Sequence, residues 1–284
     1  MGVTVQAIVR ECEAGLQGVD SPRLSAQVLV AEVLGLTRLG LSLERDRALT
    51  PEETDRIRSL AARRASGEPL AYLLGRREFY GLDFSVTPDV LIPRPETEHV
   101  IEAVLNAFSP DTPVRFADLG TGSGILAVTL AHCFPHATGL AVDLSGPALA
   151  VARRNARAHG VHDRIAFVQG DFTGPILGKG RFDLIVSNPP YVTDEEFERA
   201  SREVTGFEPR TALVSGPDGL DHIRAMLPRA LEALRPGGLL LMEIGCGQVE
   251  GVNIITSNQC LESRDVGVIK DLAGHDRVVS MRRA

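Results

Sequence analysis

Apolar residues recur at helical spacing through the first 75 residues. Val5, Ile8 and Cys12 stand three or four positions apart, which places their side chains on one face of a helix. No segment before residue 76 alternates apolar and polar positions as a half-buried strand would. Residues 1–75 are therefore predicted to form a small all-α N-terminal domain.

Two sequence signals mark where helices of this domain begin. Ser21 and Pro22 offer an N-cap side chain and an N1 proline, and Gly35 offers a C-terminal stop for the same helix. Thr50 and Glu53 have the three-residue spacing of a capping box. Helices are thus expected to begin at Pro22 and just after Thr50.

The pattern changes at residues 76–94. Two short alternating runs flank Gly81, which predicts a β-hairpin. Pro93 and Pro95 then hold Arg94 in an extended conformation, because a residue before proline avoids helical backbone angles. We interpret this region as a hairpin linker beside the active site.

From residue 95 to 284 helical and strand patterns alternate, which predicts an α/β domain with a mostly parallel sheet. A turn at Pro236-Gly237-Gly238 is expected to lead into the fifth strand, and the last two strands are expected to be antiparallel around Gly274. The predicted strands are Val114–Leu119, Gly139–Leu144, Ile165–Gln169, Leu184–Ser187, Leu239–Ile244, Val266–Lys270 and Arg277–Met281. The predicted helices are Glu96–Phe108, Ile125–Cys133, Gly146–His159 and Leu220–Leu234.

Composition narrows the classes of function. The 284 residues carry a net charge of -7, which does not suggest a broad basic surface for nucleic acid. The four cysteines are scattered, without a C-x-x-C pair, and no signal peptide or membrane-spanning run is evident. The histidines show no metal-ligand spacing. We expect a cytoplasmic protein without a metal.

A glycine-rich stretch follows the first strand of the α/β domain and opens a helix. Its spacing is G-x-G-x-G, which matches neither the dinucleotide fingerprint nor the phosphate loop of NTPases. Glycine lets the backbone turn tightly and approach a ligand closely. The candidate cofactor-binding residues here are Asp118, Gly120, Thr121, Gly122, Ser123 and Gly124.

Two acidic residues follow the next strands. Asp143, at the end of the second strand, can accept hydrogen bonds from both hydroxyls of a ribose, or it can cap the helix that begins near Ser145. Asp171 and Phe172, past the third strand, are placed to hydrogen-bond and stack an adenine. These residues predict a nucleoside-containing cofactor.

The fourth strand ends in Asn188-Pro189-Pro190-Tyr191. Proline has no N–H for a ladder, so strand pairing ends there and the Asn188 side chain has few orientations. Amide and carbonyl acceptors beside an aromatic ring suit a planar NH₂ group. This sequence is the candidate catalytic stretch.

The order of these motifs resembles class I S-adenosylmethionine-dependent methyltransferases, and N-P-P-Y resembles their amino-methylating branch. Further matches are L-I-P-R-P-E-T-E at 91–98, E-P at 208–209, A-L at 212–213, D-G-L at 218–220 and D-L-A-G-H-D-R-V at 271–278. With the N-terminal helices, they resemble the release factor glutamine methyltransferase family (HemK/PrmC type) over nearly the whole chain.

The resemblance implies a Rossmann-like domain with a seven-stranded sheet, and methyl transfer from S-adenosylmethionine, leaving S-adenosylhomocysteine. The acceptor would be the N5 amide nitrogen of the Gly-Gly-Gln glutamine in class 1 release factors, without direct nucleic-acid contact, and the enzyme a monomer that docks through residues 1–75. It implies Asn188, Pro189 and Tyr191 as catalytic residues, with Asn188 also beside the cofactor. Arg94 and Pro190 join them as substrate-binding residues.

Other interpretations stay open at this stage. A ribosomal-protein glutamine would use the same catalytic stretch, and so would a flipped DNA adenine, although the latter needs a basic recognition region. A non-enzymatic binding module is a further class. Arg94 either contacts substrate or pairs with Glu96 or Glu98, and Glu208 and Glu243 either tie the site together or are ordinary turn and strand-end charges.

One segment departs from the family pattern. Where such proteins are expected to carry an amphipathic helix, residues 248–262 contain β-branched residues and two asparagines, which form helices poorly. The local structure there is left open by the sequence.

Overall fold

The computed structural model describes residues 2–258 and 263–284. Its chain forms two compact units, Met1–Arg76 with Ser201–Phe207, and Arg77–Ala200 with Glu208–Ala284. Each unit has a hydrophobic core of its own. A seven-residue segment from the second half of the chain therefore belongs to the N-terminal unit.

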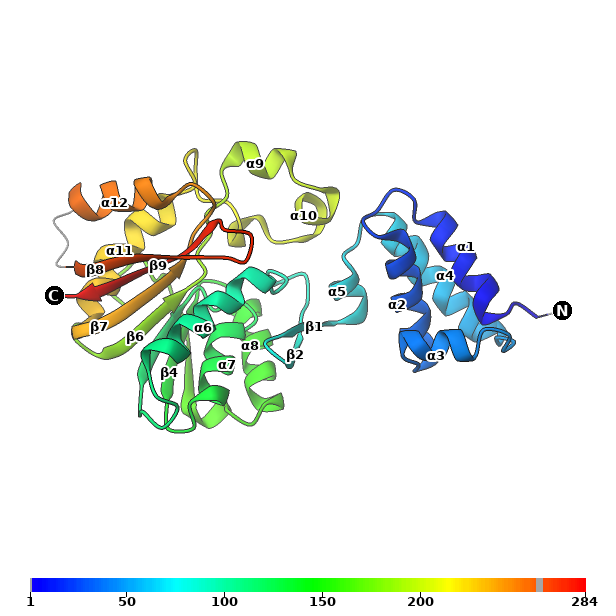
Figure 1. Ribbon diagram of the computed structural model, residues 1–284, viewed down its shortest axis with the longest axis horizontal. Coiled ribbons are helices and arrows are strands. Elements are labelled where there is room, and N and C mark those ends of the chain that lie inside the picture. The colour runs from blue at the N-terminus through cyan, green and yellow to red at the C-terminus, as the bar shows by residue number, and fades with distance from the viewer. Residues whose placement is uncertain (1, 259–262) are drawn as a thin grey trace. The chain divides into compact units, whose positions relative to one another are not determined.

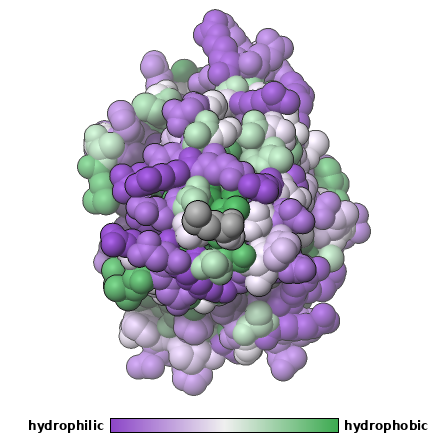
Figure 2. Space-filling model, turned by 90° about the vertical axis from the view of Figure 1, so that its right-hand side faces the viewer, coloured by the Kyte–Doolittle hydropathy of each residue, from purple (hydrophilic) through white to green (hydrophobic). Residues whose placement is uncertain are grey.

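The N-terminal unit is helical, as predicted (Figure 1). Ile8 and Val30 lie fully buried in its core together with Ile57. Hydrophilic residues dominate the face seen in Figure 2, where hydrophobic areas are small and separate, as is usual for a solvated surface. Its helices are α1 (Val5–Gly15), α2 (Pro22–Leu34), α3 (Arg38–Leu43), α4 (Pro51–Ala65), α5 (Leu70–Leu74) and, from the later segment, α10 (Arg202–Phe207).

The predicted helix starts hold, with one correction. Thr50 and Glu53 form the capping box, with hydrogen bonds of 3.1 and 2.9 Å between them. Pro22 occupies the first turn of α2 and Gly35 ends it in the left-handed region. The predicted side-chain cap by Ser21 is wrong. Ser21 has φ 51° and makes no side-chain cap, because a capping side chain requires the extended backbone that an N-cap residue normally has.

A buried arginine joins α10 to the rest of the helical unit. The side chain of Arg64 is 3% exposed, and its Nη2 donates to Glu203 Oε1 at 2.5 Å. Its Nη1 donates to the Glu68 carbonyl at 2.9 Å. The α10 segment is thus held by a charge-assisted hydrogen bond from the interior of the unit.

The predicted hairpin forms from β1 (Arg76–Phe79) and β2 (Leu82–Ser85). Tyr80 and Gly81 make the turn with φ of 52° and 75°. Two consecutive residues with positive φ match the right-handed twist of hairpin strands. Tyr80 therefore belongs to the turn and not to either of the runs that flank Gly81.

The described residues of the other unit form a seven-stranded sheet in the order β5-β4-β3-β6-β7-β9-β8. The first five of these strands are parallel, and β9 is antiparallel to both β7 and β8. The predicted Rossmann-like α/β class is confirmed. The strands are β3 (Arg115–Leu119), β4 (Thr138–Asp143), β5 (Ile165–Gln169), β6 (Phe182–Ser187), β7 (Leu234–Glu243), β8 (Ser263–Lys270) and β9 (Asp276–Arg283).

Helices cover both faces of this sheet (Figure 1). Leu184 and Val186 of β6 pack in one buried cluster with α6 and α7, while Ile185 packs in the other with α11. This alternation follows the two-residue period of a strand. The remaining elements are η1 (Pro95–Thr97), α6 (Glu98–Ala107), α7 (Ile125–Cys133), α8 (Gly146–Ala158), η2 (His162–Arg164), α9 (Asp194–Arg199), η3 (Arg210–Ala212), α11 (Asp221–Ala233) and α12 (Val249–Asn258).

The predicted turn at residues 236–238 and the atypical segment 248–262 can now be compared with the structure. The turn predicted at Pro236-Gly237-Gly238 lies inside β7, where the register with β6 shifts between Phe182 and Leu184; the strand bulges there because Gly237 has φ 77°. The atypical segment forms α12 as far as Asn258, and residues 259–262 lie outside the described part. No helix in the described residues is long and apolar enough to cross a membrane.

Candidate active site

The carboxyl ends of the central strands meet where the strand order reverses. Because β3 lies between β4 and β6, the chain proceeds from β3 to one edge of the sheet and from β6 to the other. Open α/β sheets form a ligand crevice outside the strand ends at such a reversal. Here the loops after β3, β4, β5 and β6 line a pocket of about 590 Å³, a typical volume for a small-molecule site.

The glycine-rich loop after β3 approaches this pocket with its backbone. Thr121 N donates to the Val142 carbonyl at 3.0 Å, which ties the loop to β4. Gly124 has φ 85°, and a Cβ there would lie 3.1 Å from the Cβ of Ala152. Around Gly122 there is open space, so a ligand can approach the chain closely at that residue.

Asp118, near the end of β3, has a buried carboxylate. Its Oδ2 accepts hydrogen bonds from Thr121 Oγ1 at 2.6 Å and from Ala127 N at 3.1 Å. Its Oδ1 is buried and has no hydrogen-bond partner among residues 2–258 and 263–284. Burial raises the pKa of Asp118 to about 7. An unpartnered acceptor on the wall of the pocket suits a cationic N–H donor.

Asp143 connects the glycine loop to the next helix. Its Oδ2 accepts from Gly122 N at 2.8 Å and its Oδ1 from Ser145 N at 2.9 Å. The helix-capping alternative is thus partly correct, although the side-chain cap of α8 is Ser145 itself, which accepts from Ala148 N. Burial raises the pKa of Asp143. Each carboxylate oxygen keeps a further lone pair that can accept a ligand hydroxyl.

Asp171 and Phe172 form another part of the pocket wall. Asp171 Oδ1 accepts from the Thr173 hydroxyl at 2.6 Å and from Thr173 N at 2.9 Å, and these bonds lower the pKa of Asp171. The Phe172 ring lies so close to Gly120 that a Cβ there would be 3.4 Å from the ring edge. The ring and the glycine loop therefore face the same ligand space.

Asn188 lines the pocket where β6 ends. Its Nδ2 donates to Thr97 Oγ1 at 3.0 Å, and its Oδ1 accepts no hydrogen bond from the part of the chain that the structure describes. The preceding Ser187 hydroxyl donates to the Leu119 carbonyl at 2.7 Å, which joins the ends of β6 and β3. The free acceptor of Asn188 therefore points to a ligand role.

Tyr191 is held by hydrogen bonds at its side-chain hydroxyl and at its backbone carbonyl. Its hydroxyl donates to Glu243 Oε1 at 2.9 Å, and its carbonyl accepts from Gln248 Nε2 at 2.9 Å. Burial raises the pKa of the Tyr191 phenol. Unlike Asn188 and Pro190, neither Tyr191 nor Pro189 lines the pocket itself.

Arg94 also lines the pocket. Of its two alternatives, substrate contact stays a prediction, and pairing with Glu96 or Glu98 is wrong. Arg94 donates to Glu208 Oε1 at 2.5 Å, not to Glu96 or Glu98. Glu208 is almost fully buried, and its Oε2 accepts from Ile92 N at 3.1 Å. The reading of Glu208 as an ordinary turn charge is therefore wrong, because it fastens the 91–94 segment to the E-P segment.

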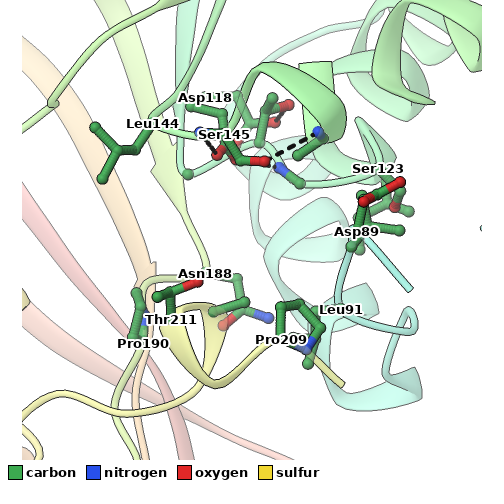
Figure 3. Close-up of a pocket in the computed structure, with 18 of the residues that line it drawn as sticks. Asp89, Leu91, Asp118, Ser123, Leu144, Ser145, Asn188, Pro190, Pro209 and Thr211 are labelled. Atoms are coloured by element: carbon green, nitrogen blue, oxygen red, sulfur yellow. Dashed lines mark hydrogen bonds between the residues drawn. The ribbon is translucent and has the colours of Figure 1, made fainter. Parts of the chain in front are cut away.

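Several pocket residues carry no signal of their own in the sequence. Figure 3 shows Asp118 and Ser145 on one side of the pocket, with Asn188 and Thr211 across from them. Some of the unassigned pocket residues lie in stretches that match the family pattern, but neither periodicity nor residue type marks any of the unassigned ones as a ligand contact. The residues that sequence reasoning did not assign include Asp89, Leu91, Ile92, Leu144, Pro209, Thr211, Ala212 and His222.

The charges around the pocket are mainly negative. The pocket is lined by four aspartates but by only one arginine and one histidine among the described residues. A ligand with positive charge is therefore favoured over one with phosphates. Within the described residues no group of three His, Cys, Asp or Glu side chains could hold a metal ion. The aspartates are Asp89, Asp118, Asp143 and Asp171.

Comparisons with known proteins agree with this architecture. Residues 7–75 match the PrmC N-terminal domain family and residues 98–205 the methyltransferase small domain family. A release factor glutamine methyltransferase of Nitratidesulfovibrio vulgaris is 48% identical over 99% of this chain and 95% of its own length. The chain belongs to the release factor glutamine methyltransferase family.

Further relatives extend the comparison. The Geobacter sulfurreducens release factor glutamine methyltransferase is 46% identical over 94% of this chain and 91% of its own. A T. thermophilus 16S rRNA methyltransferase, solved with AdoMet and guanosine, shares the fold with a TM-score of 0.54 at 17% identity, over 74% of this chain and 50% of that one. The sequence relatives show that this family member is a methyltransferase, and the solved structure shows that it shares that fold.

Proposed function

We propose that this protein transfers the methyl group of S-adenosylmethionine to the N5 amide nitrogen of the Gly-Gly-Gln glutamine in class 1 release factors. The names of relatives 48% and 46% identical support the class of substrate. The observation that carries the chemistry is the Oδ1 of Asn188, which accepts no hydrogen bond from the described residues and lies on the wall of the ligand pocket.

The pocket residues fit S-adenosylmethionine. The orphaned Oδ1 of Asp118 is suited to the ammonium of the methionine part, and the Asp143 carboxylate to the ribose hydroxyls. Asp171 would accept from the adenine amine and Phe172 would stack on the ring, while the loop that includes Gly122 leaves room for the chain of the ligand. When bound, this cofactor supplies an electrophilic methyl group on a sulfonium.

The residues of the N-P-P-Y stretch would orient the acceptor. Asn188 Oδ1 and the Pro189 carbonyl accept the two N–H bonds of the glutamine amide, and Tyr191 packs beside the amide with its π face. An amide nitrogen is a weak nucleophile because its lone pair is delocalised into the carbonyl. Fixed orientation therefore supplies much of the rate. As the N–C bond forms and the bond from the methyl group to sulfur breaks, the N–H proton becomes acidic and would pass to water, so no side-chain base is needed.

The test is methyl transfer from labelled S-adenosylmethionine to purified release factor, with a ribosomal protein and duplex DNA as parallel substrates. We expect label on the release factor, in a one-to-one complex with a monomeric enzyme, and loss of label when the Gly-Gly-Gln glutamine is replaced. Label on the ribosomal protein or on DNA alone would reject the proposed substrate. Bound cofactor without transfer to any of them would favour a binding module.

A further inference from the structure

We propose that Gln248 is a positioning residue for this transfer, because its side-chain amide fixes the backbone of the N-P-P-Y loop at Tyr191. The proposal rests on the proposed function, in which the Tyr191 ring packs beside the acceptor amide. Gln248 follows β7 and immediately precedes α12, and it is not among the described residues that line the pocket. It therefore acts through the loop that it holds and not by touching a ligand.

The side-chain amide of Gln248 joins three loops at one point. Its Nε2 donates to the Tyr191 carbonyl at 2.9 Å and to the Gly219 carbonyl at 3.3 Å. Its Oε1 accepts from Gly245 N at 2.9 Å. Tyr191 follows β6, Gly245 follows β7 and Gly219 precedes α11. One side chain therefore ties together segments that belong to three different elements of the sheet domain.

A glutamine amide matches all three of these backbone groups. A backbone carbonyl only accepts hydrogen bonds and a backbone N–H only donates one, whereas a glutamine side chain has both an NH₂ donor and an oxygen acceptor. The two carbonyls therefore fix the NH₂ side of Gln248, and Gly245 N fixes its oxygen. A glutamate here would place a carboxylate oxygen against two carbonyl oxygens, and an asparagine would be one methylene too short.

Two glycines leave the room that this amide needs. Gly219 has φ 71°, and a Cβ there would lie 2.3 Å from the Tyr191 carbonyl oxygen and 2.6 Å from Gln248 Nε2. A Cβ on Gly245 would lie 3.1 Å from Gln248 Oε1 and 3.3 Å from Tyr191 Cδ2. Because glycine has no Cβ, the backbone can approach the amide and the tyrosine closely at both positions. The chain is thus built around the contact between Gln248 and Tyr191.

The Tyr191 ring takes its orientation from the backbone that Gln248 holds. The peptide group between Tyr191 and Val192 is planar. Its N–H donates to the Leu213 carbonyl at 2.9 Å, and its carbonyl accepts from Gln248 on the other edge. The ring is held separately, where its hydroxyl donates to Glu243 Oε1 at 2.9 Å. Without Gln248, the peptide group could turn about its remaining bond to Leu213 and tilt the ring away from the acceptor.

The test measures kcat, KM for the acceptor protein and Kd for S-adenosylmethionine in two variants. Gln248→Met keeps the length of the side chain and loses all three hydrogen bonds, whereas Gln248→Glu keeps its shape and loses the NH₂ donor. Each should lower kcat by about 10- to 100-fold, because a small misplacement of the acceptor slows the transfer, and should change KM and Kd less than about threefold. An unchanged Kd also shows that the variant is folded.

A second background separates positioning of the ring from general stability. In Tyr191→Ala, which lacks the ring, Gln248→Met should lower kcat less than about threefold further, because residues that act through one another are not additive. Asn253→Asp is the matched control for Gln248→Glu. It makes the same change from amide to carboxylate at an exposed position of α12, so it should leave kcat unchanged.

Any of three results would overturn the proposal. They are a kcat for Gln248→Met equal to that of wild type, an undiminished loss of kcat in the Tyr191→Ala background, and a rise in the S-adenosylmethionine Kd that matches the fall in kcat. Every variant is compared with wild-type enzyme on the substrate that the wild-type enzyme methylates. A wrong release-factor assignment is therefore evident from the wild-type enzyme, whereas a wrong role for Gln248 is evident only from the variants.

Discussion

At the scale of single residues, Asp118 shows how a ligand site is prepared by burial. One of its oxygens holds the glycine loop and the start of α7, and the other has no partner in the described part of the chain. Such an oxygen is costly in a buried site. The cost remains until a donor arrives, which makes the protonation state of Asp118 sensitive to the contents of the pocket.

The first prediction follows from that pKa of about 7. An ammonium binds the carboxylate and not the carboxylic acid, so cofactor affinity should be full above pH 7 and fall as the pH drops below it. By calorimetry, the Kd for S-adenosylmethionine at pH 6 should be about tenfold that at pH 8. Asp118→Asn should bind weakly at both pH values, whereas Asp163→Asn, at an exposed site, should retain the wild-type profile.

The same residue affects the unliganded protein in the opposite sense. Because the folded pKa lies above the ordinary value, the contribution of Asp118 to folding is fully present below about pH 4 and is lost as the pH rises through 7. Thermal melts without cofactor should therefore show Asp118→Asn gaining stability over wild type as the pH rises from 5 to 8. A constant difference would contradict the assigned pKa.

The second prediction concerns Asn188. Removing its amide should impair orientation of the acceptor and leave the rest of the pocket intact, since its side chain makes a single hydrogen bond with the described residues, to Thr97. Asn188→Ala should lower turnover by about 100-fold or more, with cofactor Kd changed only a few-fold. Unchanged methylation would exclude Asn188 from the chemistry.

At the scale of elements, the start of α7 has to fit against α8. Gly124 combines φ 85° with a space too small for a side chain, because both the Cβ and the Cα of Ala152 would lie within 3.2 Å of a new Cβ. The left-handed conformation costs a non-glycine residue about 1–2 kcal/mol, and the clash adds to it. The loop at the cofactor pocket depends on this packing.

The third prediction is that Gly124→Ala lowers the Tm by several degrees, at roughly 2–4 °C for each kcal/mol in a protein of this size. It should also weaken S-adenosylmethionine binding. Gly15→Ala is the matched control, since nothing lies within 4 Å of its added Cβ and alanine favours a helix by about 1 kcal/mol. Equal melting temperatures for the two variants would show that the structure accommodates a Cβ at residue 124.

The sequence predicted single helices and strands better than it predicted contacts between residues far apart in the chain. Local periodicity specifies Ile125–Cys133 or Ile165–Gln169 as single elements, because each residue's face depends on its neighbours in the chain. The pairing of Arg94 with Glu208 joins positions 114 residues apart, and local spacing favoured nearer glutamates. The hydrogen bond from Asn188 Nδ2 to Thr97 Oγ1 likewise joins positions 91 residues apart, which periodicity does not reveal.

Other differences have local causes that residue type alone does not determine. Ser21 is a residue type that commonly caps helices, but it adopts a left-handed backbone conformation. Pro236 and its two glycines signal a turn, yet parallel pairing with β6 continues on both sides of the bulge and makes them part of β7. In both cases tertiary context decided between conformations that the sequence allows.

At the scale of the whole molecule, the chain enters the helical unit a second time. Arg64 is buried and holds Glu203, and Gly67 packs so closely that its added Cβ would lie 3.2 Å from the Arg202 side chain. Loss of a buried, hydrogen-bonded arginine typically destabilises its surroundings by 1–3 kcal/mol, here reduced because Glu203 is partly exposed.

The fourth prediction follows for Arg64→Met. Residues 201–207 should be released more often, so trypsin should cleave after Arg202 several-fold faster than in wild type, as seen by mass spectrometry of the fragments. Arg45→Met, which removes an arginine from the exposed pair with Asp46, should leave cleavage at Arg202 unchanged. Equal rates for the two variants would show that Arg64 does not hold the segment.

This return of the chain also limits how the molecule can be rebuilt. Peptide bonds cross between the two units at 76–77, at 200–201 and at 207–208. A chimera that exchanged residues 1–76 with a relative would pair the new helices with an old α10, and Arg64 or its replacement would meet a foreign partner. The helical unit could therefore be transplanted intact only if the seven residues from Ser201 to Phe207 were transplanted with it.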